Sequence, residues 1–130
     1  MCIFCEIIAG NIPSRKVYED EHVLAILDVN PLSAGHTLIM PKKHVDSFTE
    51  ADTETIHQCI DVAHLLAVKI TERLEAPGYN LLSNTGAVSG QSIDHLHFHI
   101  VLRYGKEKAI SFGEPDTSLD LDEILAKING

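Results

Sequence analysis

The chain has 130 residues, 45% of them apolar, and its 10 basic and 19 acidic residues give a formal net charge of −9. This length predicts a single domain over residues 1–130. The acidic balance argues against nucleic acid as a partner, because phosphate contacts need clustered lysine and arginine. The sequence has neither a run of ~20 apolar residues nor a signal-peptide pattern, so we expect no membrane association. Three cysteines suit a reducing compartment, which favours a cytoplasmic location.

The predicted elements of the N-terminal part are one short helix and three strands. In chain order they are a helical turn at Ile3–Ile8, two strands of a hairpin at 17–18 and 23–27, and a strand at 36–40. Gly10 ends the helical turn, residues 19–21 form the hairpin turn, and Pro41 closes the last strand.

A long helix is the clearest element of the middle of the chain. Apolar residues recur at spacings of three and four and trace one face: Ile56, Ile60, Ala63, Ala67, Ile70 and Leu74. Asp52 or Thr53 is the expected N-cap, and Pro77–Gly78 stops the helix. We interpret His57 and His64 as residues of its surface or boundary.

The C-terminal part adds two strands and a terminal helix. They are expected at 79–83, 95–103 and 119–128, and a glycine-containing loop covers 84–90. Because loops connect most of the five strands and only one long helix interrupts them, the sheet should be mainly antiparallel. The sequence therefore predicts an α+β fold.

Three alternating histidines, His95, His97 and His99, are the most informative feature of the chain. Successive side chains of a strand point to opposite faces, so the imidazoles share one face and the apolar residues between them face a core. A solvated strand face would more naturally carry Thr, Lys or Glu. Imidazoles titrate near neutral pH and serve as nucleophile, general acid or metal ligand. A nucleophilic histidine also needs a partner on its other ring nitrogen, which a neighbouring histidine or a backbone carbonyl can supply.

The loop from Asn84 to Ser92 directly precedes the histidines. Its small residues let backbone N–H groups approach an anion closely, and Gln91 and Ser92 add neutral donors. Glycine-containing loops are usually only turns, but next to three histidines this one predicts a phosphate-binding loop without a lysine cluster.

Cys2 and Cys5 form a Cys-x-x-Cys pair, which in a short intracellular chain can be a zinc half-site, a redox pair or a coincidence. A closed tetrahedral zinc site needs two further nitrogen or sulfur ligands. The chain offers eight histidines, and their spacing does not choose among them.

The pattern His-φ-His-φ-His-φ-φ at 95–101 resembles the signature of the histidine triad (HIT) superfamily, most closely that of the bacterial and archaeal members of its Hint branch. The resemblance runs from Cys2 to about Arg103. Its other matching segments are residues 2–8, 27–31, 35–39, 41–44 and 90–92. It implies a HIT-like fold, in which one long helix packs across a five-stranded antiparallel sheet with a short N-terminal helix, and it implies a homodimer.

The resemblance also implies hydrolysis or transfer at the α-phosphate of a purine nucleotide conjugate, above all a purine nucleoside phosphoramidate. The family's middle histidine, here His97, attacks the α-phosphorus and forms a covalent nucleotidyl-histidine that water hydrolyses. His99 contacts the phosphate, His36 completes the histidine cluster, and Ser92 relays a proton to the leaving amine. The implied nucleotide-binding residues are Asp28 and Val29 for the ribose side, Asn84, Gly90, Gln91, Ser92, His97 and His99 for the phosphate side, and Ile3, Phe4, Ile7 and Ile26 for the base.

A structural zinc ion is the last implication, with Cys2, Cys5, His44 and His95 as its four ligands. Residues 104–130 form a variable C-terminal tail that lacks the tryptophan-containing ending of animal Hint proteins. Two alternative functions stay open. One is hydrolysis of dinucleoside polyphosphates, against which the Gln-Ser pair and the Cys-x-x-Cys pair argue, and the other is a non-catalytic, nucleotide-binding regulatory role.

Overall fold

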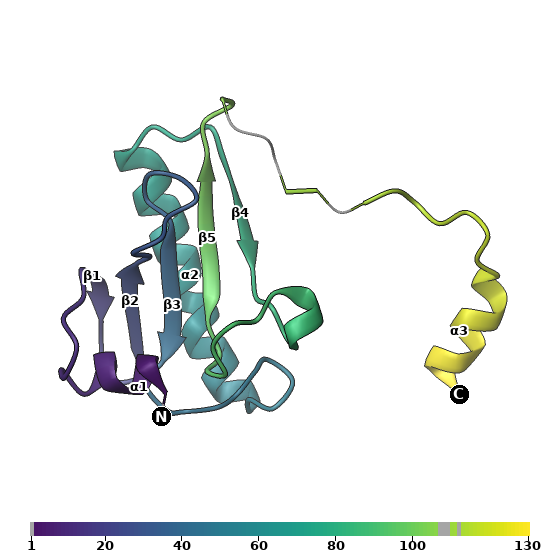
Figure 1. Ribbon diagram of the computed structural model, residues 1–130, viewed down its shortest axis with the longest axis horizontal. Coiled ribbons are helices and arrows are strands. Elements are labelled where there is room, and N and C mark those ends of the chain that lie inside the picture. Colours follow the sequence, from purple (N-terminus) through teal and green to yellow (C-terminus); the bar gives the residue numbers. More distant parts are fainter. Residues whose placement is uncertain (1, 107–109, 112) are drawn as a thin grey trace.

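A computed structural model describes residues 2–106, 110–111 and 113–130 (Figure 1). Its elements are α1 (Ile3–Ile8), β1 (Lys16–Glu19), β2 (Val23–Leu27), β3 (Thr37–Pro41), α2 (Thr53–Arg73), β4 (Gly78–Leu82), the 3₁₀ turn η1 (Ala87–Ser89), β5 (Phe98–Arg103) and α3 (Leu121–Asn129). The strands pair antiparallel in the order β1-β2-β3-β5-β4, and α2 packs across one face of the sheet. The predicted α+β fold is confirmed, with boundaries of most elements within about two residues.

The central strands are buried on both faces, because each face is covered by a different helix. In β2 and β3, Val23, Ala25 and Ile39 pack in one hydrophobic cluster with α2. Their neighbours along the strands, among them Leu24 and Leu38, pack on the opposite side in a cluster with α1. Because successive side chains of a strand point to opposite faces of the sheet, the hydrophobic core has two parts, one on each face. The short α1 helix holds the N-terminus against the sheet.

The long helix α2 is as predicted in position but differs in its buried face. Asp52 is the N-cap, and its carboxylate accepts a hydrogen bond from the Thr55 N–H at 2.8 Å. The buried residues are Thr55, Cys59, Val62, Ala63, Leu66, Ala67 and Ile70. The predicted apolar face of the helix was wrong at Ile60 and Leu74, whose side chains are 38% and 44% exposed. Ile60 follows buried Cys59 and is rotated by about 100° from it, which turns it away from the sheet. His57 and His64 are exposed, as expected.

The histidine strand is shorter than predicted, because β5 begins at Phe98 rather than at His95. The last β3 residue to pair with β5 is Ile39, opposite Phe98. Beyond that point the backbone leaves β3, and the Leu96 N–H donates to the Val45 carbonyl at 2.7 Å. The residues that alternate with the histidines still face the α2 core, as predicted.

The C-terminal helix α3 stands apart from the sheet (Figure 1). Its apolar residues, among them Leu121, Leu125 and Ile128, are exposed. The predicted tail 104–130 therefore includes a helix outside the core, while residues 107–109 and 112 lie outside the described residues. Within the described part of the chain, no helix is both long and apolar enough to cross a membrane.

Candidate active site and metal cluster

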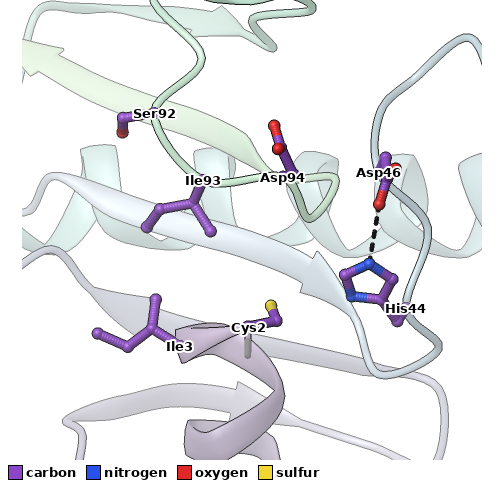
Figure 2. Close-up of a pocket in the computed structure, with 7 residues that line it drawn as sticks. All are labelled: Cys2, Ile3, His44, Asp46, Ser92, Ile93 and Asp94. Atoms are coloured by element: carbon purple, nitrogen blue, oxygen red, sulfur yellow. Dashed lines mark hydrogen bonds and ion pairs between the residues drawn. The ribbon is translucent and has the colours of Figure 1, made fainter.

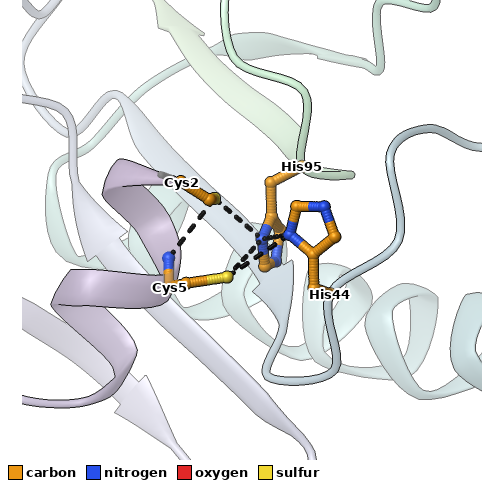
Figure 3. Close-up of side chains that lie close together, drawn as sticks. All are labelled: Cys2, Cys5, His44 and His95. Carbon is orange, nitrogen blue, oxygen red and sulfur yellow. Dashed lines mark hydrogen bonds between the residues drawn. The ribbon is translucent and has the colours of Figure 1, made fainter.

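Two cysteines and two histidines meet where α1, the segment after β3 and the segment before β5 come together (Figure 3). The Cys2 Sγ lies 3.3 Å from the His95 Nδ1, and the Cys5 Sγ lies 3.3 Å from the His44 Nδ1. The Cys5 Sγ is 3.7 Å from the His95 Nδ1, and the two Nδ1 atoms are 3.2 Å apart. The fold therefore selects His44 and His95 as the partners of the cysteine pair.

The ring nitrogens of this cluster are oriented for a metal. His95 Nε2 lies 2.8 Å from the Pro41 carbonyl, and His44 Nε2 lies 2.9 Å from an Asp46 carboxylate oxygen. Both oxygens only accept hydrogen bonds, so each Nε2 carries a proton, and Nδ1 is the ring nitrogen that faces the cysteines. Burial also lowers the pKa of His95, which keeps its ring neutral. The two Nδ1 atoms, 3.2 Å apart, are placed so that both can bind one cation together with the cysteines.

The donor set fits a four-coordinate zinc ion. Tetrahedral ligands with Zn–N of about 2.0 Å and Zn–S of about 2.3 Å lie about 3.3–3.8 Å from one another. The four sulfur–nitrogen and nitrogen–nitrogen distances stated above are 3.2–3.7 Å, and all four ligand atoms lie within 4.8 Å of one another. The cluster can hold a metal with all four positions filled by protein.

A second set of histidines lines a cavity of about 360 Å³ between α1 and the sheet, which we call the histidine cavity. Its lining residues are Ile3, Phe4, Ile7, Ile26, Leu27, Asp28, Val29, Asn30, Leu38, Ser92, Ile93, His97 and His99. Most of these side chains are apolar, and the polar ones include Asp28, Ser92, His97 and His99. Apolar walls with a few polar groups are typical of small-molecule sites.

His97 has one ring nitrogen fixed by the backbone, and the other has no hydrogen-bond partner among the residues that the structure describes. Its Nδ1 lies 2.7 Å from the His95 carbonyl oxygen, which accepts and therefore places the proton on Nδ1. Burial lowers the pKa of His97 below its usual range, which favours a neutral ring. The ring of Phe4 packs edge-on against it, with centroids 5.0 Å apart. The Nε2 lone pair of His97 is thus available as a base or nucleophile.

His99 carries its proton on Nε2 rather than on Nδ1, because of a chain of hydrogen bonds that runs through His36. The Leu32 N–H donates to His36 Nδ1 at 3.0 Å, so neutral His36 carries its proton on Nε2. That group lies 3.0 Å from His99 Nδ1, which accepts and leaves His99 with an Nε2–H donor. Burial, followed by the neighbouring His97 and His36, lowers the pKa of His99 to about 4. The site therefore offers a neutral acceptor on His97 beside a neutral donor on His99, with ring centroids 4.9 Å apart.

Asp28 lies at the edge of this group. One of its carboxylate oxygens accepts from the Asn30 N–H at 2.8 Å, and the other lies 3.5 Å from His36 Nε2. Because the side chain is 19% exposed, the carboxylate is open to a ligand in the histidine cavity. Asp28, His36 and His99 also form a group that could hold a cation.

Ser92 joins the histidine cavity to a second one of about 470 Å³, which we call the side cavity (Figure 2). The side cavity is lined by Cys2, Ile3, His44, Asp46, Ser92, Ile93 and Asp94. Ser92, Ile3 and Ile93 line both cavities, so Ser92 lies where the two cavities meet. Asn84, Gly90 and Gln91 lie in the loop leading to Ser92, and within the described residues they are not part of either lining.

Residues 9–106 match the family described as HIT domain. The chain belongs to the HIT family. A HIT-like protein of Methanocaldococcus jannaschii is 47% identical over 131 residues and covers the full length of both chains. The adenosine 5′-monophosphoramidase of Schizosaccharomyces pombe is 38% identical over 125 residues, 96% of this chain and 91% of that protein. A crystal structure of a HIT family member from Bacillus subtilis superposes with a TM-score of 0.87 at 42% identity, covering 98% of this chain and 94% of the other.

The structure adds residues to this HIT site that the sequence patterns did not indicate. Asp46 and the Pro41 carbonyl orient the two histidines of the metal cluster. The Leu32 N–H sets the tautomer of His36. Ile93 lines both cavities. Two of these four features are backbone groups, and the other two are side chains of residues outside the matched segments, which no sequence pattern indicates.

We expect the stability of this HIT protein to fall as the pH decreases from about 6.5 to about 4. In the folded state burial lowers the pKa of His36 and of His99, the latter to about 4, whereas unfolded histidines titrate near 6.5. Between these values the unfolded chain binds more protons, so acid favours unfolding. Urea unfolding midpoints at pH 6.5 and 4.5 check this. The midpoint should change less in His99→Asn than in the wild type, and equal changes would contradict the assignment.

Proposed function

We propose that the chain is a nucleotidyl hydrolase or transferase that acts at the α-phosphate of a purine nucleotide conjugate, and most specifically a purine nucleoside phosphoramidase. One observation carries the proposal. His97 has a lone pair on Nε2 in a cavity, its Nδ1–H is held by the His95 carbonyl at 2.7 Å, and His99 brings an N–H donor beside it. This combination suits nucleophilic attack on a phosphate.

In the first step His97 Nε2 attacks the α-phosphorus, and the bond from phosphorus to the leaving nitrogen breaks. The leaving amine takes up a proton, for which the Ser92 hydroxyl is the proposed relay from solvent, since it lines both cavities. The intermediate carries phosphorus on Nε2 and the original proton on Nδ1. The His95 carbonyl accepts from that Nδ1–H and stabilises the positive charge of the ring.

In the second step water attacks the same phosphorus, and the bond to His97 Nε2 breaks. The nucleoside monophosphate leaves with the new oxygen, the water loses its two protons to product and solvent, and the ring returns to its neutral form. The His99 Nε2–H donates to a phosphate oxygen in both steps. The role of His36 is indirect. Its Nε2–H donates to His99 Nδ1, which keeps the His99 proton on Nε2.

The nucleotide is proposed to lie along the histidine cavity. Asp28, with Val29 beside it, would receive the ribose hydroxyls, because a carboxylate accepts two hydrogen bonds side by side. The base would pack between apolar side chains, namely Ile3, Phe4, Ile7 and Ile26. The phosphate would approach the loop that contains Asn84, Gly90 and Ser92, where the side chain of Asn84 lies next to Gly90. Gly90 has a φ of +110°, a conformation that favours glycine.

The Cys2–Cys5–His44–His95 cluster is proposed to hold one zinc ion per chain. When bound, zinc would act as a structural crosslink, since four protein ligands leave no position for substrate. These residues tie α1 to the segments that precede β5 and follow β3. His95 thereby belongs to both sites, through its ring to the metal and through its carbonyl to His97.

A homodimer is also proposed, through β4. β4 is an edge strand, so its outer backbone groups can pair with another strand. Tyr79 and Leu81 on β4 are 45% and 44% exposed. Burial of this apolar face against a second copy would stabilise the pair.

Turnover of a substrate panel tests the proposed function. Purified protein should release AMP from an adenosine phosphoramidate faster than from a diadenosine polyphosphate. The reverse order would favour a dinucleoside polyphosphate hydrolase. Tight AMP binding without turnover of any nucleotidyl conjugate would favour a regulatory, nucleotide-binding role instead.

A further inference from the structure

The side chain of Gln91 makes three hydrogen bonds, all to backbone groups. Its Nε2 donates to the Asp46 carbonyl at 2.7 Å and to the Ile93 carbonyl at 3.1 Å. Its Oε1 accepts from the Gly86 N–H at 2.9 Å. Because both amide hydrogens and the oxygen are engaged, the side chain is arranged to hold the protein together rather than to receive a ligand.

The two carbonyls that Gln91 contacts are placed symmetrically about the metal cluster. Asp46 is two residues after His44, and its carboxylate accepts from the His44 Nε2–H at 2.9 Å. Ile93 is two residues before His95, and its carbonyl also accepts from the His95 N–H at 2.9 Å. One amide group thus bridges the backbone beside both histidines whose Nδ1 atoms face the metal position.

The third contact of Gln91 leads away from the cluster into the 84–92 loop. Gly86 has a φ of +86° and is the N-cap residue directly before η1, and its carbonyl accepts from the Gln91 N–H at 3.3 Å. Gly86 and Gln91 therefore close the loop on itself through one backbone and one side-chain hydrogen bond. Ser92, the next residue, lies where the two cavities meet.

We propose that Gln91 is a positioning residue that couples metal binding at Cys2, Cys5, His44 and His95 to the conformation of the 84–92 loop, and so to the position of Ser92. A metal bound by the four side chains would fix the separation of the segments that carry His44 and His95, whose Nδ1 atoms lie 3.2 Å apart. The Gln91 amide can contact the Asp46 and Ile93 carbonyls at once only while these two segments keep this separation. With the metal bound, the segments are fixed and the loop is closed over them.

The catalytic consequence rests on the proposed function, but the coupling itself does not. A loop that closes only when the metal is bound places Ser92 beside the leaving group only in the metal-bound protein. The position of His99 is less dependent on Gln91, since His99 is held by His36. We therefore expect loss of Gln91 to lower kcat for a poor amine leaving group more than it raises KM.

The test compares three full-length variants with the wild type. Gln91→Ala removes all three hydrogen bonds, while Gln91→Glu keeps an acceptor for the Gly86 N–H but lacks the two amide donors. Gln58→Ala, at the other glutamine of the chain and on α2, is the control. Two measurements are made with Zn²⁺ alone and no nucleotide: zinc affinity by competition with a chromophoric chelator, and amide hydrogen exchange of residues 84–92 with and without zinc.

In the wild type, zinc should slow exchange of the 84–92 loop. Both Gln91 variants should bind zinc about two- to thirty-fold more weakly, the usual range for residues that couple two sites, and should lose most of the zinc-dependent protection. Gln58→Ala should match the wild type. Wild-type zinc affinity together with unchanged zinc-dependent protection in Gln91→Glu would overturn the proposal. Absence of phosphoramidase turnover in every protein would instead count against the proposed function, and would leave the exchange result valid.

Discussion

His97→Ala is expected to lower the release of AMP from an adenosine phosphoramidate by more than about 10⁴-fold in kcat/KM, in line with the loss of a catalytic nucleophile. The reason is that no other group in the described site combines a free imidazole lone pair, a fixed tautomer and a place in the cavity. His99 cannot replace it, because its Nδ1 accepts from His36 at 3.0 Å and its Nε2 carries the proton.

The matched control for this variant is His64→Ala. His64 is an exposed histidine on α2, so its loss should leave turnover within about twofold of the wild type. Circular dichroism of both variants shows whether the fold is kept. Normal turnover in His97→Ala would show that the nucleophile is assigned wrongly.

Loss of one zinc ligand has the second largest expected effect. Cys2→Ser should reduce the metal content from one zinc per chain to a small fraction, and it should remove the stabilisation by zinc. At free zinc of about a thousand times its Kd, that stabilisation is about 4 kcal/mol. The measurements are elemental analysis of protein prepared without chelator and thermal unfolding with and without added zinc.

Cys59→Ser is the control for Cys2→Ser, because it removes a cysteine that is not a proposed zinc ligand. Cys59 is fully buried on the side of α2 that faces the sheet, where burial raises its pKa to about 12, and it lies outside the metal cluster. Its variant should be less stable than the wild type but should still bind one zinc and respond to it. A Cys2→Ser protein with full zinc content, or wild-type protein without zinc, would refute the proposed site.

Much of the fold could be predicted from the sequence, because its signals are local. Apolar spacing, caps and turn residues located the five strands and α2, and Asp52 was recognised as a possible N-cap. The start of β5 was not predictable in this way. Alternation continues through His95 and His97, but tertiary contacts end the pairing at Phe98, where the backbone turns toward Val45.

The candidate site could also be predicted from the sequence only in part. The family pattern brought together the residues that meet in the metal cluster and in the histidine cavity. Their protonation could not be foreseen, because it depends on the Leu32 N–H and on the Pro41 and His95 carbonyls, which any residue type could supply. The sequence also suggested Gln91 as a phosphate ligand. That role stays a prediction, while its side chain is engaged with three backbone groups.

The central claim is that His97 becomes covalently bound to the nucleotide, and rapid acid-free quenching during turnover tests it most directly. Mass spectrometry of the quenched wild-type protein should find one added nucleoside monophosphate on the peptide that contains His97. Its Nδ1 is held by the His95 carbonyl, so the adduct should form on Nε2, which NMR of the trapped species can distinguish. An actively turning-over enzyme with no such adduct, or with the nucleotide attached to another residue, would contradict the account.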